Sequence, residues 1–271
     1  MTDLFRQSYA IANTAIAIYE PYAIVLAVSG GDDSLTAYHL SKVLGIRIDA
    51  ILHINTRTGI QQTTEFVRKL AENEGIKYIE GDAGDTYEKY VLRKGFYGVG
   101  MHAHSYAYHY LKDQFIRKEL AKIRQRKHNR NILILNGVRI TESSNRAKNL
   151  KEPYRKHGSN IWVNLIHWWK KSDCMDFLAD NKICRNPVSV ELCRSGECMC
   201  GTMQSKQARI EASILFPKWG QWLDELEKKV MLKFPWGWGE NMPKNFGALR
   251  NEDNQSNFQP MCSSCLKDEK Q

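Results

Sequence analysis

The sequence has no long hydrophobic run. Its longest apolar stretch, from Ala23 to Val28, is far shorter than the ~18 residues of a membrane span. The first residues, MTDLFRQSYA, have no basic patch followed by an apolar segment, so they do not read as a secretory signal. From these absences we expect a cytoplasmic protein with no membrane partner.

Acidic residues are scarce relative to basic ones. Lysine and arginine number 39 against 30 aspartates and glutamates, a formal net charge of +9. This excess favours polyanionic partners, nucleotides or nucleic acid, although a solvated basic surface would give the same balance. With 42% hydrophobic and 25% charged residues, the chain is not disordered, collagen-like or a coiled coil. Its 271 residues predict one large domain, or one with a small appendage.

Strand and helix patterns alternate along the first two thirds of the chain. Runs rich in β-branched residues, typical of buried strands, are separated by helical patterns. Strands that alternate with helices predict an α/β fold with a doubly wound parallel sheet, which we place at residues 1–181. The strand runs are 22–28, 47–55, 76–82 and 131–137, and the helical patterns include 35–45, 63–75 and 105–126.

The composition changes after Asn181. Prolines, glycines, tryptophans and most of the seven cysteines crowd together there, and one clear helix is predicted, at about 203–233. We predict that residues 182–271 form a small cysteine-rich C-terminal module that binds a metal or a cluster, because such a segment has little core of its own.

A glycine-rich segment, SGGDDS, lies between the first strand and a helix. Gly30 and Gly31 let the backbone approach a phosphate closely, and the N–H groups of the loop and helix start suit an anion. Ser29 and Ser34 can donate hydroxyl hydrogen bonds. Asp33 is a poor phosphate ligand, so we expect it to bind Mg²⁺ or to make a structural hydrogen bond.

The stretch AVSGGDDS (27–34) resembles the pyrophosphate-binding loop, Ser-Gly-Gly-x-Asp-Ser, of the PP-loop ATP pyrophosphatases. The resemblance implies an adenine nucleotide alpha hydrolase-like fold. It also implies an enzyme that cleaves ATP between the α and β phosphates, adenylates a substrate and releases pyrophosphate. Asp32 departs from many members, which often have a lysine or a small residue there. A carboxylate at this place needs a nearby cation or an outward orientation.

Three further stretches, 53–67, 137–147 and 164–188, are similar to segments of the phosphoadenylylsulfate (PAPS) reductase family, so the resemblance spans roughly residues 22–203. The first two read HINTRTGIQQTTEFV and GVRITESSNRA. In a helical segment, Arg139 and Arg146 would share one face and could clamp phosphate or sulfate; a solvated basic helix start is the alternative. The resemblance implies nucleotide binding by Ser29, Gly30, Gly31, Asp33, Ser34, Gly137 and Arg139, and catalytic roles for Asp33, Arg139 and Arg146.

Four cysteines form two short pairs, Cys198 with Cys200 and Cys262 with Cys265. Such pairs can converge on one four-thiolate site for zinc or an iron–sulfur cluster, although free thiols or a redox pair would give the same spacing. The arrangement is similar to the cluster ligands of adenylylsulfate reductases, and the sulfur-transfer ATPases of DNA phosphorothioation also carry a cluster. The resemblance therefore favours a [4Fe-4S] cluster, with zinc as the alternative. Cys193 is left as a substitute ligand or a mobile sulfur acceptor.

Residues 112–130 form a basic stripe with only two acids, Asp113 and Glu119. The stripe suits a phosphate backbone, although it also fits a solvated helix face. His102 and Lys112 are further candidates for lining the active site. The basic residues of the stripe are Lys112, Arg117, Lys118, Lys122, Arg124, Arg126, Lys127 and Arg130.

These patterns and resemblances together favour an ATP pyrophosphatase that adenylates a substrate for sulfur transfer, using ATP and Mg²⁺. Nucleic acid is the preferred acceptor, as in DNA phosphorothioation, and a cysteine desulfurase is the implied sulfur donor. One alternative is an atypical reductase of adenylyl sulfate or PAPS, although the end of the chain, CSSCLKDEKQ, lacks that group's Glu-Cys-Gly-Leu-His-type motif. A second alternative is a non-catalytic accessory subunit that binds ATP and nucleic acid.

Overall fold

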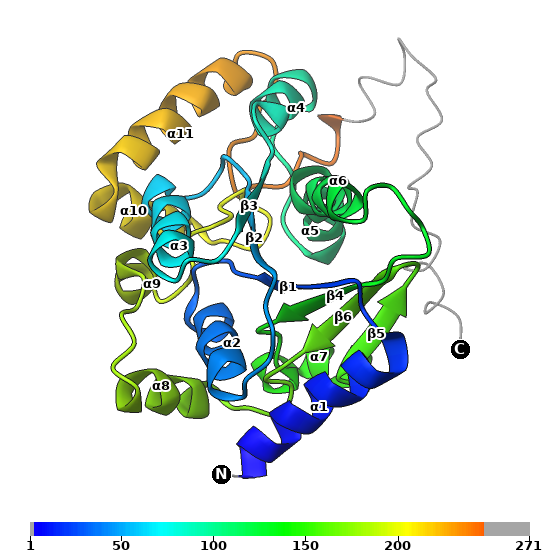
Figure 1. The fold of residues 1–271 in the computed structure, drawn as a ribbon. Coiled ribbons are helices and arrows are strands. Elements are labelled where there is room, and N and C mark those ends of the chain that lie inside the picture. The colour runs from blue at the N-terminus through cyan, green and yellow to red at the C-terminus, as the bar shows by residue number, and fades with distance from the viewer. Residues whose placement is uncertain (1–2, 247–271) are drawn as a thin grey trace.

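The computed structural model describes residues 3–246, apart from the side chains of 144–146. One six-stranded sheet with the order β3-β2-β1-β4-β6-β5 forms its centre (Figure 1). Every neighbouring pair is parallel except β5 and β6, which are antiparallel. The strands are β1 (Ala23–Ala27), β2 (Ala50–Asn55), β3 (Tyr78–Asp82), β4 (Ile132–Asn136), β5 (Tyr154–His157) and β6 (Asn160–Asn164).

Helices cover both faces of the sheet, because alternate strand residues are apolar on both sides. In β1, Ile24 and Leu26 pack against α1, α2, α3 and α8, whereas Val25 faces α6. Figure 1 shows α1 and α2 on one side of the sheet and α6 on the other. The predicted doubly wound α/β fold is therefore confirmed. The helices of this part are α1 (Asp3–Tyr19), α2 (Asp32–Val43), α3 (Gln61–Asn73), α4 (Thr86–Lys94), α5 (Met101–Tyr108), α6 (Gln114–Ile123), α7 (Ser144–Asn149) and α8 (Lys171–Asp180).

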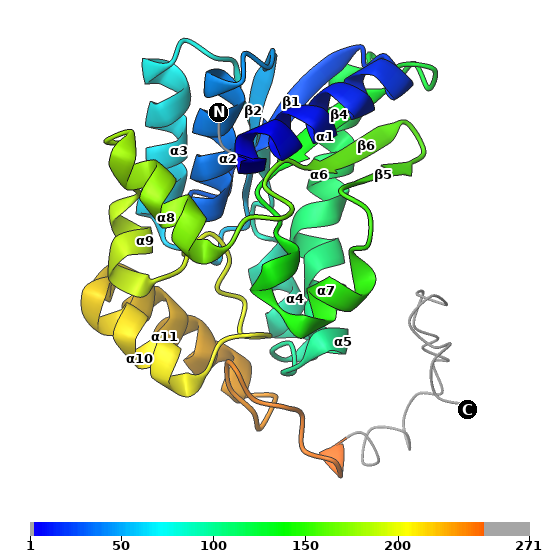
Figure 2. The same cartoon turned by 90° about the horizontal axis from the view of Figure 1, so that it is seen from below.

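The segment after residue 182 contains α9 (Pro187–Leu192), α10 (Lys206–Leu215) and α11 (Pro217–Met231). Figure 2 shows α8 to α11 following one another along one side of the molecule. Leu223 and three tryptophans, Trp219, Trp236 and Trp238, join a buried cluster that also contains Tyr87 of α4. The described part of the predicted module thus packs on the α/β domain, and the boundary at residue 181 stays a prediction.

Three local expectations differ from the structure. The single helix predicted at 203–233 is two helices, because Pro217 begins a new one and has no N–H to continue the first. The helix predicted at 105–126 contains a π-helical segment, His109–Asp113, between α5 and α6. The β5–β6 hairpin was not predicted. Among the described helices, none has the length and hydrophobicity needed to cross a membrane.

Candidate nucleotide site

The glycine-rich loop lies where the strand order of the sheet reverses. Strand β1 pairs with β2 on one side and with β4 on the other, so the chain leaves β1 in one direction and later returns on the opposite side. Residues 29–31 connect β1 to α2, and residues 137–139 follow β4. The crevice at the carboxyl ends of two such strands is where open α/β sheets bind their ligands.

The loop is held by residues far away in the sequence. Gly30 has a φ of +79°, and a Cβ at this position would lie only 2.7 Å from Cγ2 of Thr63, so glycine is needed on both counts. The carbonyl oxygen of Gly30 accepts a hydrogen bond of 2.9 Å from Nδ2 of Asn186. That asparagine is fully buried and also caps α9. Contacts from α3 and α9 therefore fix the path of the loop.

Two hydroxyls and a second glycine complete the loop's contacts. The hydroxyl of Ser34 accepts a hydrogen bond from the backbone N–H of Ser29 at 3.2 Å and donates one to the Gly31 carbonyl at 2.9 Å. On the β4 side, a Cβ on Gly137 would lie 2.3 Å from the carbonyl oxygen of Asp33. Gly137 thus lets the two loops meet backbone to backbone at the start of α2.

Asp33 is paired with two cations. Arg139 donates from Nε and Nη2 to Oδ2 of Asp33 at 3.0 and 2.8 Å, and Nζ of Lys171 lies 3.2 Å from Oδ1. Burial lowers the pKa of Arg139, but the hydrogen bonds and charge of Asp33 outweigh it and raise that pKa overall. The site therefore presents a charged guanidinium and an ammonium beside the loop, with Asp33 as their shared partner.

Arg139 and Arg146 do not share a helical face, so that expectation is wrong. Arg139 has an extended backbone and precedes the short 3-10 turn Ile140–Glu142, whereas Arg146 belongs to α7, which begins at Ser144. Ser143 between them is also extended. Because the segment is not one continuous helix, the seven-residue spacing does not place the two residues on one face.

Asp32 is directed inward and is neutralised there. It is 8% exposed and accepts hydrogen bonds from Nε and Nη2 of Arg185 at 2.8 and 3.0 Å and from Nζ of Lys171 at 3.0 Å. Burial raises the pKa of Asp32, but these bonds and charges outweigh it, so the pKa lies below its ordinary value. Of the two expectations for this carboxylate, the nearby cation is the one that the structure shows.

Lys171, Arg185 and Asn186 were not singled out from the sequence. They lie more than 130 residues from the loop they contact, and a basic residue type alone does not reveal such a partner in a chain with 39 of them. The one local signal was the Asn186-Pro187 dipeptide, which is typical of a turn that starts a helix.

Two connected cavities meet at the loop. One, of about 380 Å³, is lined by Ser29, Ser34, Arg139 and Lys171, and also by Cys193 and Arg194. The other, of about 410 Å³, shares Ser29, Asp33 and Ser34 with the first and extends over apolar side chains. One end of the combined space is polar; we call it the cationic end for Arg139, Lys171 and Arg194, which are matched there by the carboxylates of Asp32, Asp33 and Glu142. The other end, called the apolar end, is lined by Leu52, Ile54, Ile116 and Trp162 and also by the charged pair Lys112 and Glu197.

Lys112 also lines the apolar cavity, as the sequence suggested. Its Nζ donates to Oε2 of Glu197 at 2.6 Å. Burial lowers the pKa of Lys112, but the carboxylate outweighs it and the pKa is raised. The basic stripe is therefore not one free face. Some of its members are paired locally, Arg117 with Asp113 and Lys122 with Glu119, and others, Lys118, Arg126 and Lys127, are exposed.

The C-x-C pair lies beside this cleft. The hydroxyl of Thr58 lies 3.7 Å from the sulfur of Cys198 and accepts from the backbone N–H of Met199 at 3.1 Å. A hydrogen bond from the Cys198 thiol lowers the pKa of Cys200, which suits it to a thiolate ligand. Within residues 3–246 no group of three or more metal-ligating side chains is present, and Cys262 and Cys265 lie outside the described residues.

The three other cysteines lie in different surroundings. Cys174 is fully buried in α8, and burial raises the pKa of its thiol to about 12. Cys184 and Cys193 are both exposed, and Cys193 borders the cationic cavity. Cys193 is thus placed next to the nucleotide cleft, and its role as an acceptor stays a prediction.

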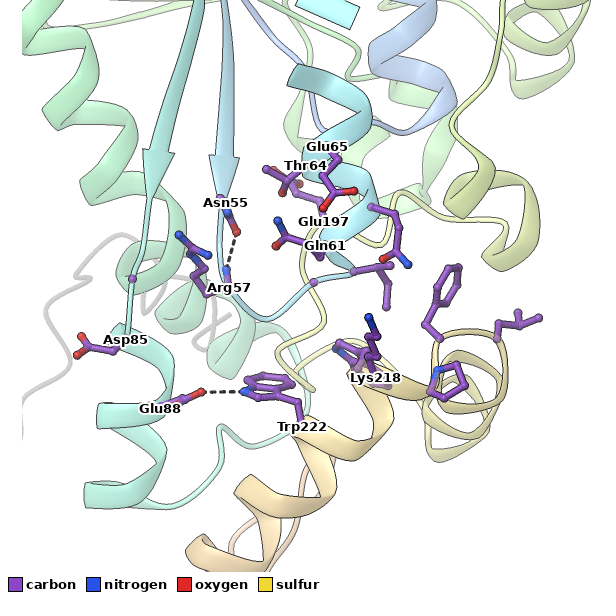
Figure 3. Close-up of a pocket in the computed structure, with 18 residues that line it drawn as sticks. Asn55, Arg57, Gln61, Thr64, Glu65, Asp85, Glu88, Glu197, Lys218 and Trp222 are labelled. Atoms are coloured by element: carbon purple, nitrogen blue, oxygen red, sulfur yellow. Dashed lines mark hydrogen bonds between the residues drawn. The ribbon is translucent and has the colours of Figure 1, made fainter. Parts of the chain in front are cut away.

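A larger cavity of about 820 Å³ lies on the other side of Glu197, between the end of β2 and the α10–α11 corner (Figure 3). Arg57 there is paired with Asp82, and Nε1 of Trp222 donates to Glu88 at 2.7 Å. Lys218 is the second cation of this cavity, against the carboxylates of Glu65, Asp85, Glu88 and Glu197. The acidic balance makes it less suited to a polyphosphate than the cleft at the loop.

Comparisons with known proteins found several similar chains. Solved structures with a similar fold include PAPS reductase from Candida auris in a phosphate complex, at 13% identity and a TM-score of 0.48, covering 67% of this chain and 82% of that one. NMN synthetase from Francisella tularensis matches at 13% identity and 0.47, covering 83% and 94%. The U34-tRNA thiolase from Methanococcus maripaludis with its [4Fe-4S] cluster matches at 12% and 0.43, covering 95% and 90%.

None of the curated proteins gives a significant match. Residues 23–203, however, match the phosphoadenosine phosphosulfate reductase domain. The match contains the loop at 29–34, both sides of the cleft and the C-x-C pair. The family recognised from the sequence is therefore confirmed, and the chain belongs to the phosphoadenosine phosphosulfate reductase domain family.

Proposed function

We propose that the protein is an ATP pyrophosphatase that adenylates a nucleic acid for sulfur transfer, as in DNA phosphorothioation. The observation that carries the proposal is the cleft where the strand order reverses. There a glycine loop and the start of α2 lie against Arg139 and Lys171 at one end, and apolar side chains line the other. A triphosphate fits the cationic end and an adenine fits the apolar end, because each half offers the matching chemistry.

Mg²⁺ would be held at Asp33 together with the phosphates. The Asp33 side chain is partly exposed, at 23%, and hard oxygen ligands are those that Mg²⁺ prefers. Glu142, an exposed carboxylate, also lines this end. When bound, the ion would neutralise charge on the phosphates. Arg139 and Lys171, now paired with Asp33, would then contact the phosphate oxygens.

The reaction we propose transfers an adenylyl group. An oxygen of the acceptor, such as a non-bridging phosphate oxygen, bonds to the α-phosphorus of ATP while the bond to the β-phosphate oxygen breaks and pyrophosphate leaves. A sulfide-level sulfur, supplied by a cysteine desulfurase with a thiol reductant, then bonds to the activated centre as AMP leaves. Arg139 and Lys171 stabilise the negative charge that develops on the phosphates.

A metal centre would be held by Cys198, Cys200, Cys262 and Cys265, with a [4Fe-4S] cluster preferred and zinc as the alternative. The described pair fits by its chemistry, because the two sulfurs lie within hydrogen-bonding reach of each other and thiolates suit either group. That hydrogen bond lowers the pKa of Cys200 and, together with burial, raises the pKa of Cys198, so the second thiol must lose its proton as the metal binds. When bound, a cluster would offer an iron site for sulfur, whereas zinc would only hold the C-terminal segment. Cys198 directly follows Glu197, which lines the cleft, so a metal held by this cysteine would lie near the nucleotide.

The test is pyrophosphate release from Mg·ATP by anaerobically purified protein, with iron and zinc measured on the same sample. Water can take the place of the acceptor oxygen in this assay, so the parent should hydrolyse ATP to AMP and pyrophosphate. Lys171→Met should lower the rate roughly 10²-fold, the usual cost of removing one charge-stabilising group. Lys69→Met, in an exposed position on α3, should leave the rate unchanged. Formation of ADP and orthophosphate would contradict the proposal, and ATP binding without turnover would indicate an accessory subunit instead.

Family membership supports a second candidate, reduction of adenylyl sulfate or PAPS. Such an enzyme would bind its nucleotide in the same cleft but break the bond to sulfur. Sulfite release from either compound in the presence of thioredoxin, with no pyrophosphate from ATP, would establish this candidate in place of the first.

A further inference from the structure

A second polar groove joins the apolar end of the nucleotide cleft. It has a volume of about 670 Å³ and lies over β5, β6 and the end of α7. Tyr108, Asn136, Val138 and Trp162 line both this groove and the nucleotide cleft. A ligand in the groove would therefore lie next to a nucleotide bound in the cleft, separated only by these shared side chains.

The groove has an excess of free positive charge. Lys148, Lys151 and Arg155 line it together with one carboxylate, Glu152. All four are exposed, and none of the three cations has an ion-pair partner among the described residues. A fourth cation, Arg117, is already paired with Asp113. Lys148 lies at the end of α7, Lys151 in the connection that follows it and Arg155 on the edge strand β5, so they outline a path for an anion.

Aromatic rings lie at the junction with the cleft. Tyr108 is 40% exposed, and Trp162 is half-buried beside Arg155, its cross-strand partner in the β5–β6 pair. Cations along a groove with rings at its base are the combination by which proteins bind single strands, since bases stack on the rings while the backbone meets the charges. A duplex keeps its bases stacked inside and would leave the rings without a partner.

We propose that this groove binds single-stranded nucleic acid and directs one backbone phosphate toward the α-phosphate of ATP. The inference rests on the proposed function, since it names the place and form of the acceptor. It also replaces the 112–130 stripe as the binding surface, because that stripe has paired residues at Arg117 and Lys122 and turns Lys112 into the cleft.

The test compares two triple variants that remove the same charge. Lys148→Gln/Lys151→Gln/Arg155→Gln removes the three unpaired positive charges of the groove. Lys118→Gln/Arg126→Gln/Lys127→Gln removes three exposed positive charges of the stripe. Binding of a fluorescein-labelled 12-nucleotide DNA or RNA strand, and of the matching duplex, is followed by anisotropy at several salt concentrations without ATP. Thermal unfolding of each variant checks that the fold is kept.

We expect the groove variant to bind at least tenfold more weakly and its salt slope to fall by about 2, because three contacts to a single strand contribute about 0.7 each. The stripe variant should bind like the parent, and the parent should prefer the single strand to the duplex. The proposal is overturned if the stripe variant alone loses affinity, if both lose it equally, or if the duplex binds as tightly. It is also overturned if adenosine 3′,5′-bisphosphate competes as well as the oligonucleotide.

These results are separable from the test of the proposed function. Oligonucleotide binding is measured without ATP, and pyrophosphate release is measured without nucleic acid. Groove-dependent binding with no pyrophosphate would keep the groove and reject the enzyme activity. Pyrophosphate release with no oligonucleotide binding would do the reverse.

Discussion

Replacing Gly137 with alanine tests whether the close approach of the two loops matters. The new Cβ would lie 2.3 Å from the carbonyl oxygen of Asp33 and 2.7 Å from the backbone nitrogen of Ser34, at the start of α2. Ordinary contacts of a Cβ are 3.4–4 Å. Both are backbone atoms, so the loop itself must move by about 1 Å. A misplacement of about 1 Å costs roughly 10² in rate when it displaces reacting groups.

The stability change should be smaller than the loss of activity. Overpacking costs about 1–3 kcal/mol, and a new alanine without a positive φ returns about 0.4–1 kcal/mol by restricting the unfolded chain. We therefore expect Gly137→Ala to unfold about 1–2 kcal/mol more easily in urea, to bind ATP more weakly and to release pyrophosphate roughly 10²-fold more slowly. The control is Gly98→Ala, whose Cβ would lie 2.8 Å from Oδ1 of Asn241, so that a side chain has to move there and not the backbone. A Gly137→Ala protein with parental stability and ATP affinity would refute the reasoning.

Three further changes have definite expected results. Asp32→Asn should lower the free energy of unfolding by about 1–3 kcal/mol. Because the pKa of Asp32 is depressed in the folded protein, this loss should be full above pH 3.8 and become smaller below it. Urea titrations at pH 7 and pH 3 that give the same loss would contradict this expectation. Leu223→Ala should cost about 2–5 kcal/mol in the same assay, because the side chain is fully buried; a smaller loss would mean that the C-terminal cluster relaxes. Cys198→Ser or Cys200→Ser should remove most bound iron or zinc while the exposed Cys184→Ser retains it, and metal analysis showing equal content would exclude the thiolate site.

The sheet and its loop could be predicted from local patterns. The run from Ala23 to Val28 ends directly in glycines and is followed by a helical pattern, and each of these signals lies within a few residues. The family resemblance rested on the same continuous stretches. The existence of β1, β2 and β4 needed no long-range information, since each has an apolar run long enough to be buried on both faces. β3 has no such run and is mostly half-buried.

The cleft's charged partners could not be predicted in this way. Lys171 and Arg185 reach Asp32 across more than 130 residues, and only closure of the fold places them there. The β5–β6 hairpin was missed because β5 is short and basic, so it has no apolar run to signal a strand. The break between Arg139 and Arg146 was missed because spacing indicates a shared face only where a helix is already established.

The edge strand β5 also affects how copies of this protein meet. An exposed strand edge offers unpaired N–H and C=O groups to any other extended chain. Here the edge is only four residues long and presents three consecutive residues with basic side chains, Arg155, Lys156 and His157, all exposed. A second strand docking there would have to remove water from these side chains, and a second copy of the same edge would bring like charges together. This edge of the sheet is thus protected from edge-to-edge aggregation.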